Sequence, residues 1–245
     1  MNLLLVAATW DEIKPLENFL QEMDAEGKFH DHAVEICVTG IGGVQTAFHL
    51  GKILSTGKWD LAIQLGICGS FRKEFPIGTT VNVAEECFAD FGVEDGEIFL
   101  DAFEIGLLEA NKFPFENGVM KNKSASETAV PILGRLSAGE VGRENFLSKL
   151  SRARGISVNK VHGNEKSIQQ IISKYDADVE SMEGAAFFYC CKMASVPFFE
   201  LRTVSNFVER RDKSKWDTGL AIKNLNSVAE KILLQLVGSN ADSEN

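Results

Sequence analysis

The chain has 245 residues, 44% of them hydrophobic and 24% charged, which fits one large α/β domain that buries its own core. The net charge of −10 argues against a nucleic-acid partner, because an acidic surface repels a phosphate backbone. Five cysteines without a CxxC pair indicate neither a disulfide framework nor a metal site, and no apolar run approaches the ~20 residues of a membrane span. We therefore expect a cytoplasmic protein with reduced thiols, no metal and no membrane partner.

Strand and helix patterns alternate through the first third of the chain. The apolar run 3–8 is short and lacks a basic leader, so it predicts a buried first strand rather than a signal peptide. The elements that follow are a helix over 11–23, a strand over 34–39, a helix opened by the glycines of 40–43, a strand over 61–65 closed by a glycine turn at 66–70, and a strand over 80–84. Residues 85–127 are rich in turn residues, and we expect irregular structure there, some of it over a pocket.

The alternation continues in the second half of the chain. The predicted elements are a strand over 130–137, a short helical or irregular connection over 141–150, a strand over 156–161, a helix over 166–174, an apolar helix that begins at Met182, a strand over 197–204 and an amphipathic helix over 218–237. This order predicts one α/β domain over 1–237, with a central mixed, mostly parallel twisted sheet flanked by helices on both faces. Residues 238–245 form a polar tail.

Two glycine-rich segments follow predicted strands. Gly40-Ile-Gly-Gly43 resembles a phosphate-binding turn, but Gln45 stands where a dinucleotide fingerprint needs its third glycine. We therefore favour tight packing of strand on helix and expect no cofactor. The turn at 66–70, which contains Cys68 and Gly69, would present backbone N–H groups at the carboxyl end of a strand, where α/β sheets bind ligands.

Charged residues at two further places need an explanation. Glu180 and Glu183 are three residues apart near the start of the apolar helix, so both can lie near one face. Helix-start electrostatics accounts for Glu180 better than for Glu183. Arg202 lies inside a buried strand pattern and needs a carboxylate partner, which Glu183 or Glu12 could supply. An ion pair without chemistry is the alternative.

In their order along the chain, these motifs resemble the nucleoside phosphorylase/nucleosidase family that acts on purine nucleosides. The pieces that carry the resemblance are Ala7-Ala8 followed by Glu12, Gly40-Ile-Gly42, Gly66-Ile-Cys-Gly69, Met182-Glu183, and Arg202 followed by Ser205-Asn206. Within the family, the stretches 90–97, 158–163, 179–186 and 205–216 are similar to the futalosine hydrolase branch. That branch splits futalosine, on the route to menaquinone, into hypoxanthine and a sugar that bears a carboxyphenyl ketone.

The resemblance implies a role for each matching residue. Glu12 would activate the attacking water, and Arg202 would help to hold that water and the sugar. Met182 and Glu183 would lie against the ribose, and the backbone at Cys68 and Gly69 would line the sugar and base. Asn206 would contact the departing purine, where adenine-cleaving relatives have Asp.

Two features bear on the substrate. The amide of Asn206 can donate both to N7 and to a 6-oxo group, which favours a hypoxanthine-like base. The substrate's carboxylate needs a cation, for which Arg210, Arg211 and Lys213 are candidates, and Phe91, Phe99 and Phe207 are candidates for stacking on the base, with core packing as the equal alternative.

Three alternatives remain open. The chain could be a methylthioadenosine/adenosylhomocysteine nucleosidase, a 6-oxopurine nucleoside phosphorylase, or a nucleoside-binding protein without activity. Asp11 and Glu12 beside the first strand would repel phosphate, which favours hydrolysis over phosphorolysis. The family also leads us to expect a homo-oligomer, formed through the helix from Met182 or the segment 85–127.

Overall fold

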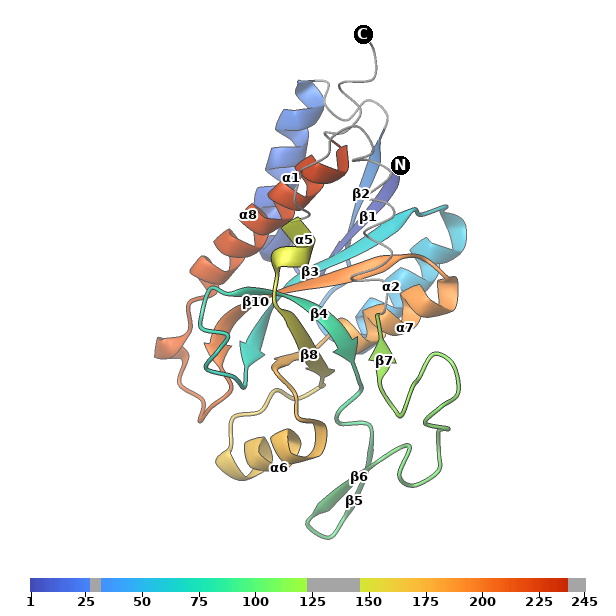
Figure 1. The fold of residues 1–245 in the computed structure, drawn as a ribbon, viewed down its shortest axis with the longest axis vertical. Coiled ribbons are helices and arrows are strands. Elements are labelled where there is room, and N and C mark those ends of the chain that lie inside the picture. Colours follow the sequence, from blue (N-terminus) through green and yellow to red (C-terminus); the bar gives the residue numbers. More distant parts are fainter. Residues whose placement is uncertain (27–31, 123–145, 238–245) are drawn as a thin grey trace.

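The computed structural model describes residues 1–26, 32–122 and 146–237. One mixed sheet organises these residues (Figure 1). Its order is β10-β4-β8-β9-β3-β1-β2, and β10 also pairs with β3, so that β3, β9, β8, β4 and β10 close into a barrel from which β1 and β2 extend. The bounds of these strands are β1 Asn2–Ala7, β2 Ala33–Val38, β3 Leu61–Ser70, β4 Thr80–Glu86, β8 Arg152–Ser157, β9 Val179–Ser181 and β10 Phe198–Phe207, and the short β7 Met120–Lys121 joins β4.

Most strand pairs are parallel. The pairs β1–β2, β1–β3, β3–β10, β4–β8 and β8–β9 are parallel, whereas β4–β10, β3–β9 and β4–β7 are antiparallel. The predicted mixed, mostly parallel sheet is therefore confirmed. Its closure into a barrel was not predicted, because it depends on pairings between strands far apart in the sequence.

Helices cover both faces of the sheet, as predicted (Figure 1). On one face lie α1 (Trp10–Ala25), α8 (Thr218–Val237) and the short α5 (Phe146–Lys149), and on the other α2 (Gly43–Thr56) packs on α7 (Gly184–Ala194). The helix α6 (Glu165–Tyr175) and the hairpin of β5 (Gly92–Asp95) and β6 (Ile98–Asp101) lie together beyond β8 and β4. A 3₁₀ turn, η1 (Lys213–Lys215), precedes α8.

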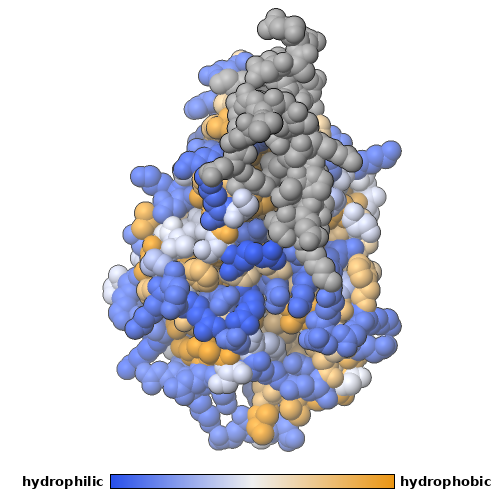
Figure 2. Space-filling model, viewed as in Figure 1, coloured by the Kyte–Doolittle hydropathy of each residue, from blue (hydrophilic) through white to orange (hydrophobic). Residues whose placement is uncertain are grey.

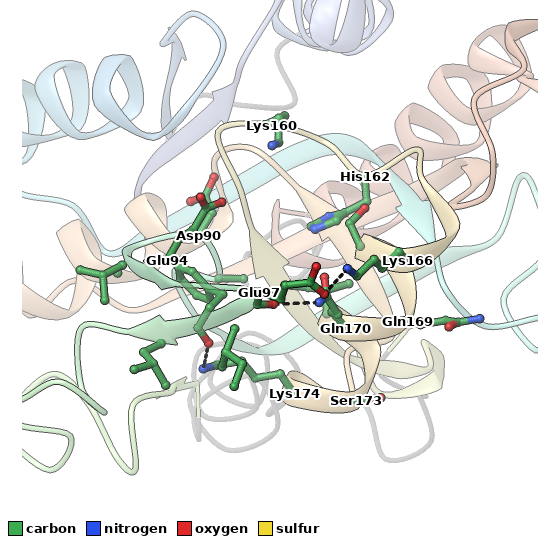
Figure 3. Close-up of a pocket in the computed structure, with 18 of the residues that line it drawn as sticks. Asp90, Glu94, Glu97, Lys160, His162, Lys166, Gln169, Gln170, Ser173 and Lys174 are labelled. Atoms are coloured by element: carbon green, nitrogen blue, oxygen red, sulfur yellow. Dashed lines mark hydrogen bonds and ion pairs between the residues drawn. The ribbon is translucent and has the colours of Figure 1, made fainter.

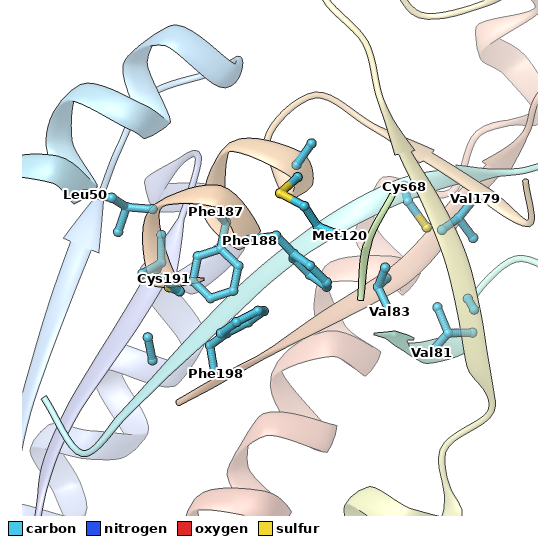
Figure 4. Close-up of a cluster of buried hydrophobic side chains, with 14 of the residues drawn as sticks. Leu50, Cys68, Val81, Val83, Met120, Val179, Phe187, Phe188, Cys191 and Phe198 are labelled. Carbon is cyan, nitrogen blue, oxygen red and sulfur yellow. The ribbon is translucent and has the colours of Figure 1, made fainter. Parts of the chain in front are cut away.

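Apolar side chains from α2, α7 and the barrel fill the core under α7 (Figure 4). Phe188 and Phe198 meet edge to face with ring centroids 4.8 Å apart, and Phe187 meets Phe198 in the same way at 5.4 Å. Such pairs contribute about 0.5–1.5 kcal/mol beyond the area that they bury. This packing fixes α7, and with it the position of Glu183 at its N-cap.

The outer surface in the view of Figure 2 is largely hydrophilic, with an apolar patch over the β5–β6 hairpin at the lower end. Val93 and Ile98 are exposed in this hairpin. No helix among the described residues is both long enough and apolar enough to cross a bilayer.

Several predicted boundaries were wrong. The predicted turn at 66–70 is strand, because β3 runs unbroken to Ser70 and pairs with β10 along this stretch. The strand expected over 156–161 begins earlier and ends at Ser157, and the helix expected from Met182 begins at Gly184. Glu180 therefore lies in β9 and not in the first turn of a helix. The segment 85–127, expected to be irregular, contains a hairpin and β7.

Other predictions fall partly or wholly outside the described residues. These are the strand over 130–137, the first half of the connection over 141–150, and the tail over 238–245.

Candidate active site

A cavity of about 440 Å³ opens where β1, β3, β9 and β10 end beside the first turns of α1 and α7. Six of the seven residues that the sequence singled out line it: Glu12, Cys68, Gly69, Met182, Glu183 and Asn206. The seventh, Arg202, is not among the described residues of its wall. Segments separated by up to about 190 residues therefore converge on one space.

Glu12 is held by three hydrogen bonds at one end of this cavity. Its Oε2 accepts from the N–H of Thr9 at 3.0 Å and from the Thr9 hydroxyl at 2.9 Å, and its Oε1 accepts from the N–H of Ile67 at 3.1 Å. Glu12 is the N3 residue of α1 and Thr9 its N-cap, so the helix start orients the carboxylate. Gly66 is required in β3, because a Cβ there would collide with Arg202 and lie 3.3 Å from Glu12 Oε1.

A buried amide on α8 stabilises the turn of α1 that carries Glu12. Pro15 lies inside α1, where it cannot donate a backbone hydrogen bond. Asn226 bridges the turn of α1 between Glu12 and Leu16. Its Oδ1 accepts from the N–H of Leu16 at 3.0 Å, and its Nδ2 donates to the carbonyl of Glu12 at 2.9 Å. The amide ties the turn of α1 behind the carboxylate to α8.

Asn226→Leu is expected to lower the free energy of unfolding by about 2–3 kcal/mol, because it leaves the N–H of Leu16 and the carbonyl of Glu12 without this partner. Urea denaturation measures the change. Asn224→Leu is the control, since it removes a single bond to the carbonyl of Gly78 nearer the surface and should cost less than about 1 kcal/mol. Equal losses in the two variants would contradict the bridging role.

Glu183 closes the opposite wall and is fixed from two sides. Its Oε1 accepts from the N–H of Gly42 at 2.9 Å, and its Oε2 accepts from Nη1 of Arg202 at 3.3 Å. Gly42 has a φ of +93°, a conformation that glycine adopts without strain. The glycine turn 40–43 therefore docks on a carboxylate, and a Cβ on Gly43 would meet Ala186 of α7 at an ordinary 3.7 Å.

Arg202 lies behind Glu183, fully buried in β10. Its Nε donates to Glu200 Oε1 at 2.5 Å and its Nη1 also donates to the carbonyl of Ile67. Burial acts against the charge, but Glu200 and Glu183 outweigh it and raise the pKa of Arg202 above its ordinary value. Of the two predicted partners, Glu183 is confirmed and Glu12 forms no direct ion pair with it in the described structure, whereas Glu200 was not predicted. This position makes Arg202 a positioning residue for Glu183.

A fourth carboxyl group, Glu86 in β4, lies against the same network. Its Oε2 accepts from the hydroxyl of Ser157 at 3.0 Å. A Cβ on Gly184 would collide with Oε1 of both Glu86 and Glu200, so the two carboxyl groups face each other across this glycine. Burial and then the charge of Glu200 raise the pKa of Glu86 well above its usual range. The core around Glu86 therefore favours the neutral form of this carboxyl group.

Glu86→Gln is expected to stabilise the protein relative to wild type increasingly as the pH rises above 4.5, the ordinary value of this carboxyl. A folded-state pKa raised above the unfolded one gives stability that is full at low pH and is lost as pH rises through the folded pKa, at up to about 1.4 kcal/mol per pH unit. Gln does not titrate and avoids this loss. Urea unfolding at pH 5 and pH 8 measures it.

Glu85→Gln is the matched control, since Glu85 is the neighbouring residue of β4 but is partly exposed and pairs with Lys121 at 3.6 Å. It should show no such rise. A Glu86→Gln difference that is the same at pH 5 and pH 8 would contradict the neutral acid.

Asn206 lies at the end of β10, after a bulge that follows Val204 in its pairing with β3. Its Oδ1 accepts from the hydroxyl of Ser205 at 2.8 Å, and its Nδ2 donates to the carbonyl of Phe207 at 3.0 Å. Gly69 gives room to both neighbours at the end of β10, because a Cβ there would stand 2.7 Å from Cγ2 of Val208 and 3.3 Å from Nδ2 of Asn206. One N–H of the amide remains for a ligand, so Asn206 can make one of the two predicted base contacts in this geometry.

The thiol of Cys68 is not a nucleophile. Cys68 is buried beside the cavity, and burial raises the pKa of its thiol to about 12. The thiol is therefore neutral near pH 7, and only thiolates attack efficiently.

Sequence reasoning missed other parts of the wall. His162 lines the cavity and is anchored by Glu180, which accepts from its backbone N–H at 2.9 Å and from its ring Nδ1. The prediction that Phe91, Phe99 or Phe207 stacks on the base was wrong, because none of them lies in the described wall. Trp216 is the one Phe, Tyr or Trp residue there. Trp216 and His162 both reach the site from loops, so no helix or strand periodicity marks them, although both fall in stretches that carry the family resemblance.

Comparison with known proteins places this geometry in a family. The model of the phosphorylase superfamily matches residues 24–237, which is most of the chain. The chain belongs to the phosphorylase superfamily. Glu12 precedes the matched residues, so its place in the site rests on its contacts with Thr9 and Ile67.

Two curated relatives from the superfamily align with most of the chain. A futalosine hydrolase of Thermus thermophilus is 28% identical over 204 residues, covering 82% of this chain and 81% of that protein. A 5′-methylthioadenosine/S-adenosylhomocysteine nucleosidase of Maridesulfovibrio salexigens is 26% identical, covering 87% and 89%. The solved structure of a Helicobacter pylori futalosine hydrolase superposes with a TM-score of 0.69 at 14% identity over 97% of each chain, which shows the shared fold.

A second, larger cleft of about 980 Å³ lies between the β5–β6 hairpin and α6 (Figure 3). Its charges are mostly paired with each other: Lys166 with Glu97 at 2.6 Å, and Lys174 with Glu104 and, at 3.5 Å, with Asp101. These bonds hold the hairpin to the helix. His162 lines both spaces, so the cleft lies directly beside the candidate active-site cavity. Among the described residues, no group of three His, Cys, Asp or Glu could hold a metal ion.

Proposed function

We propose that this protein hydrolyses the N-glycosidic bond of futalosine, releasing hypoxanthine and the sugar that bears the carboxyphenyl ketone. The observation that carries the proposal is that Glu12, Glu183 and Asn206 line one cavity. An acid beside the attacking water, an acid beside the ribose and an amide beside the leaving base are the groups that this reaction needs. Relatives named as futalosine hydrolases support the same substrate.

The proposed chemistry follows from charge. When the C1′–N9 bond breaks, its electron pair stays on the purine and the sugar becomes oxocarbenium-like, as in glycoside hydrolysis. The oxygen of water bonds to C1′ while its proton passes to Glu12. Glu183, fixed by Gly42 and Arg202, accepts hydrogen bonds from the ribose hydroxyls. The free N–H of Asn206 stabilises the negative charge on the departing base.

Water rather than phosphate is the proposed nucleophile. Asp11 and Glu12 lie in the same wall, and Arg211 is the one Lys or Arg among the described lining residues. A phosphate dianion would meet carboxylates there without the cations that it needs. Phosphorolysis, the activity of other members of the superfamily, is thereby disfavoured on charge.

HPLC of purified enzyme with futalosine, with and without phosphate, tests the function. The expected result is hypoxanthine release at the same rate in both. Release that requires phosphate would support the phosphorylase, preference for methylthioadenosine would support that nucleosidase, and binding without any release at high enzyme concentration would support a binding protein. Failure to release hypoxanthine from futalosine would overturn the proposal.

We also propose that the protein is a cytoplasmic homo-oligomer. All five cysteines are free thiols, which suits a reducing compartment. The adjoining helices α2 and α7 expose large apolar side chains, with Val44 81%, Phe48 67% and Met193 53% exposed. Exposed large apolar side chains on adjoining helices are typical of an interface, and a second copy of the chain is the proposed occupant.

Phe48→Asp is expected to convert the oligomer into monomers, because it places a charge in the proposed apolar interface. Size-exclusion chromatography with light scattering measures the mass. Lys52 lies on the same helix and is already polar, so Lys52→Ala should keep the wild-type mass. A monomeric wild type, or an unchanged mass for Phe48→Asp, would rule this interface out.

A further inference from the structure

Arg211 is the one Lys or Arg among the described residues that line the candidate active-site cavity. The other ionisable groups of the described wall are Asp11, Glu12, His162, Glu180 and Glu183. Glu183 is already paired with Arg202 and Glu180 is bonded to His162, and Arg211 is the one Lys or Arg of the described wall that can attract an anionic part of a ligand. A fixed cation in an otherwise acidic wall therefore indicates where a ligand's negative charge lies.

The carboxylates nearest to Arg211 in the sequence do not neutralise it. Asp212 caps η1, accepting from the N–H of Ser214 at 3.0 Å and from its hydroxyl at 2.7 Å. Glu209 pairs with Lys215 at 2.7 Å. Within the described structure Arg211 forms no ion pair, and its charge is available to a ligand.

The position of Arg211 is fixed by stacking rather than by an ion pair. The centre of its guanidinium lies 5.0 Å from the ring centroid of Trp216, which also lines the cavity. Gly163 gives it room, because a Cβ there would stand 3.3 Å from the Cβ of Arg211. A guanidinium held over an aromatic ring by a cation–π contact can still present N–H groups to a ligand, and its fork of donors matches a carboxylate with two parallel hydrogen bonds.

The geometry points to Arg211 as the specificity-determining residue that binds the carboxylate of the carboxyphenyl group, with Trp216 as the platform that orients it. This inference rests on the proposed function and extends it to the part of the substrate that differs from simple purine nucleosides. The three cations that the sequence offered, Arg210, Arg211 and Lys213, are all exposed, but among them Arg211 alone belongs to the described wall of the cavity. The structure thus distinguishes Arg211 from its two neighbours.

The test combines two substrates with three enzymes. The substrates are futalosine and its methyl ester, which differ only in the charge of the carboxyphenyl group, and the enzymes are wild type, Arg211→Ala and Arg210→Ala. Hypoxanthine release gives kcat/KM for each combination. Wild type and Arg210→Ala should prefer the acid over the ester by about 10- to 100-fold, the value of a charged hydrogen-bond pair. In Arg211→Ala the acid and the ester should agree within about threefold.

Two results would overturn the inference: a wild type indifferent to the ester, or an Arg211→Ala variant that keeps the wild-type preference because it loses activity equally on both substrates. The last would mark a structural role, which cannot distinguish the acid from the ester. A wild type that releases no hypoxanthine from futalosine would instead overturn the proposed function, so the two failures are distinguishable.

Discussion

Replacing Glu12 with Gln is expected to lower kcat for hypoxanthine release from futalosine by about 10³-fold, within the range found for general acid–base groups. The amide has the size of the carboxylate and keeps one oxygen, which can accept from one of the two N–H groups, of Thr9 and Ile67, that now bond to separate oxygens of Glu12. It cannot take a proton from water. Binding of the nucleoside should therefore change by less than about threefold, because the lost interaction acts only in the transition state.

Steady-state kinetics, together with a binding measurement on the inactive variant, checks this prediction. Glu17→Gln is the matched control, since Glu17 lies on the same helix but pairs with Lys14 at the surface at 2.5 Å. It should keep wild-type turnover. An unchanged kcat for Glu12→Gln would remove Glu12 from the mechanism, and a loss of binding equal to the loss of turnover would make its role structural.

The sequence predicts the layers of this fold better than their closure. Periodicity marks α8 at its true bounds, because its apolar face repeats over twenty residues. It fails at Gly66 and Gly69, which indicate a turn on local grounds but lie within β3. Their reason is not local: Gly66 makes room for Arg202, and Gly69 makes room for the amide of Asn206.

The same distinction applies to the site. The spacing in the sequence could have identified Glu200 as a partner of Arg202, since residues two apart on a strand share a face. Nothing local could have identified Glu86, which reaches the network from another strand and lies against Gly184. Trp216 and Arg211 reach the cavity through the loop after β10, where no helix or strand periodicity indicates which way a side chain points. The sequence alone does not identify the side chains that act through tertiary contacts.

Asn206→Asp is expected to shift the preference between 6-oxo and 6-amino bases toward the amino form, by at least about 10²-fold and up to the order of 10⁴ where a site is built around the bond. The wild-type amide has one N–H left to donate, since Nδ2 already donates to the carbonyl of Phe207. In the Asp variant an oxygen faces that carbonyl. The repulsion favours the protonated acid, whose other oxygen can accept from a 6-amino group.

Competition between futalosine and its 6-amino analogue, followed by HPLC of both bases, gives the ratio of kcat/KM directly. Asn164→Asp makes the same chemical change at the N-cap of α6, where Asp caps as well as Asn, and should leave the ratio as in wild type. If Asn206→Asp loses activity on both bases alike, the amide stabilises the leaving group without reading position 6, because Ser205 and Phe207 would then be holding it for N7 alone. If the ratio moves, the one free N–H of Asn206 is what distinguishes hypoxanthine from adenine in this cavity.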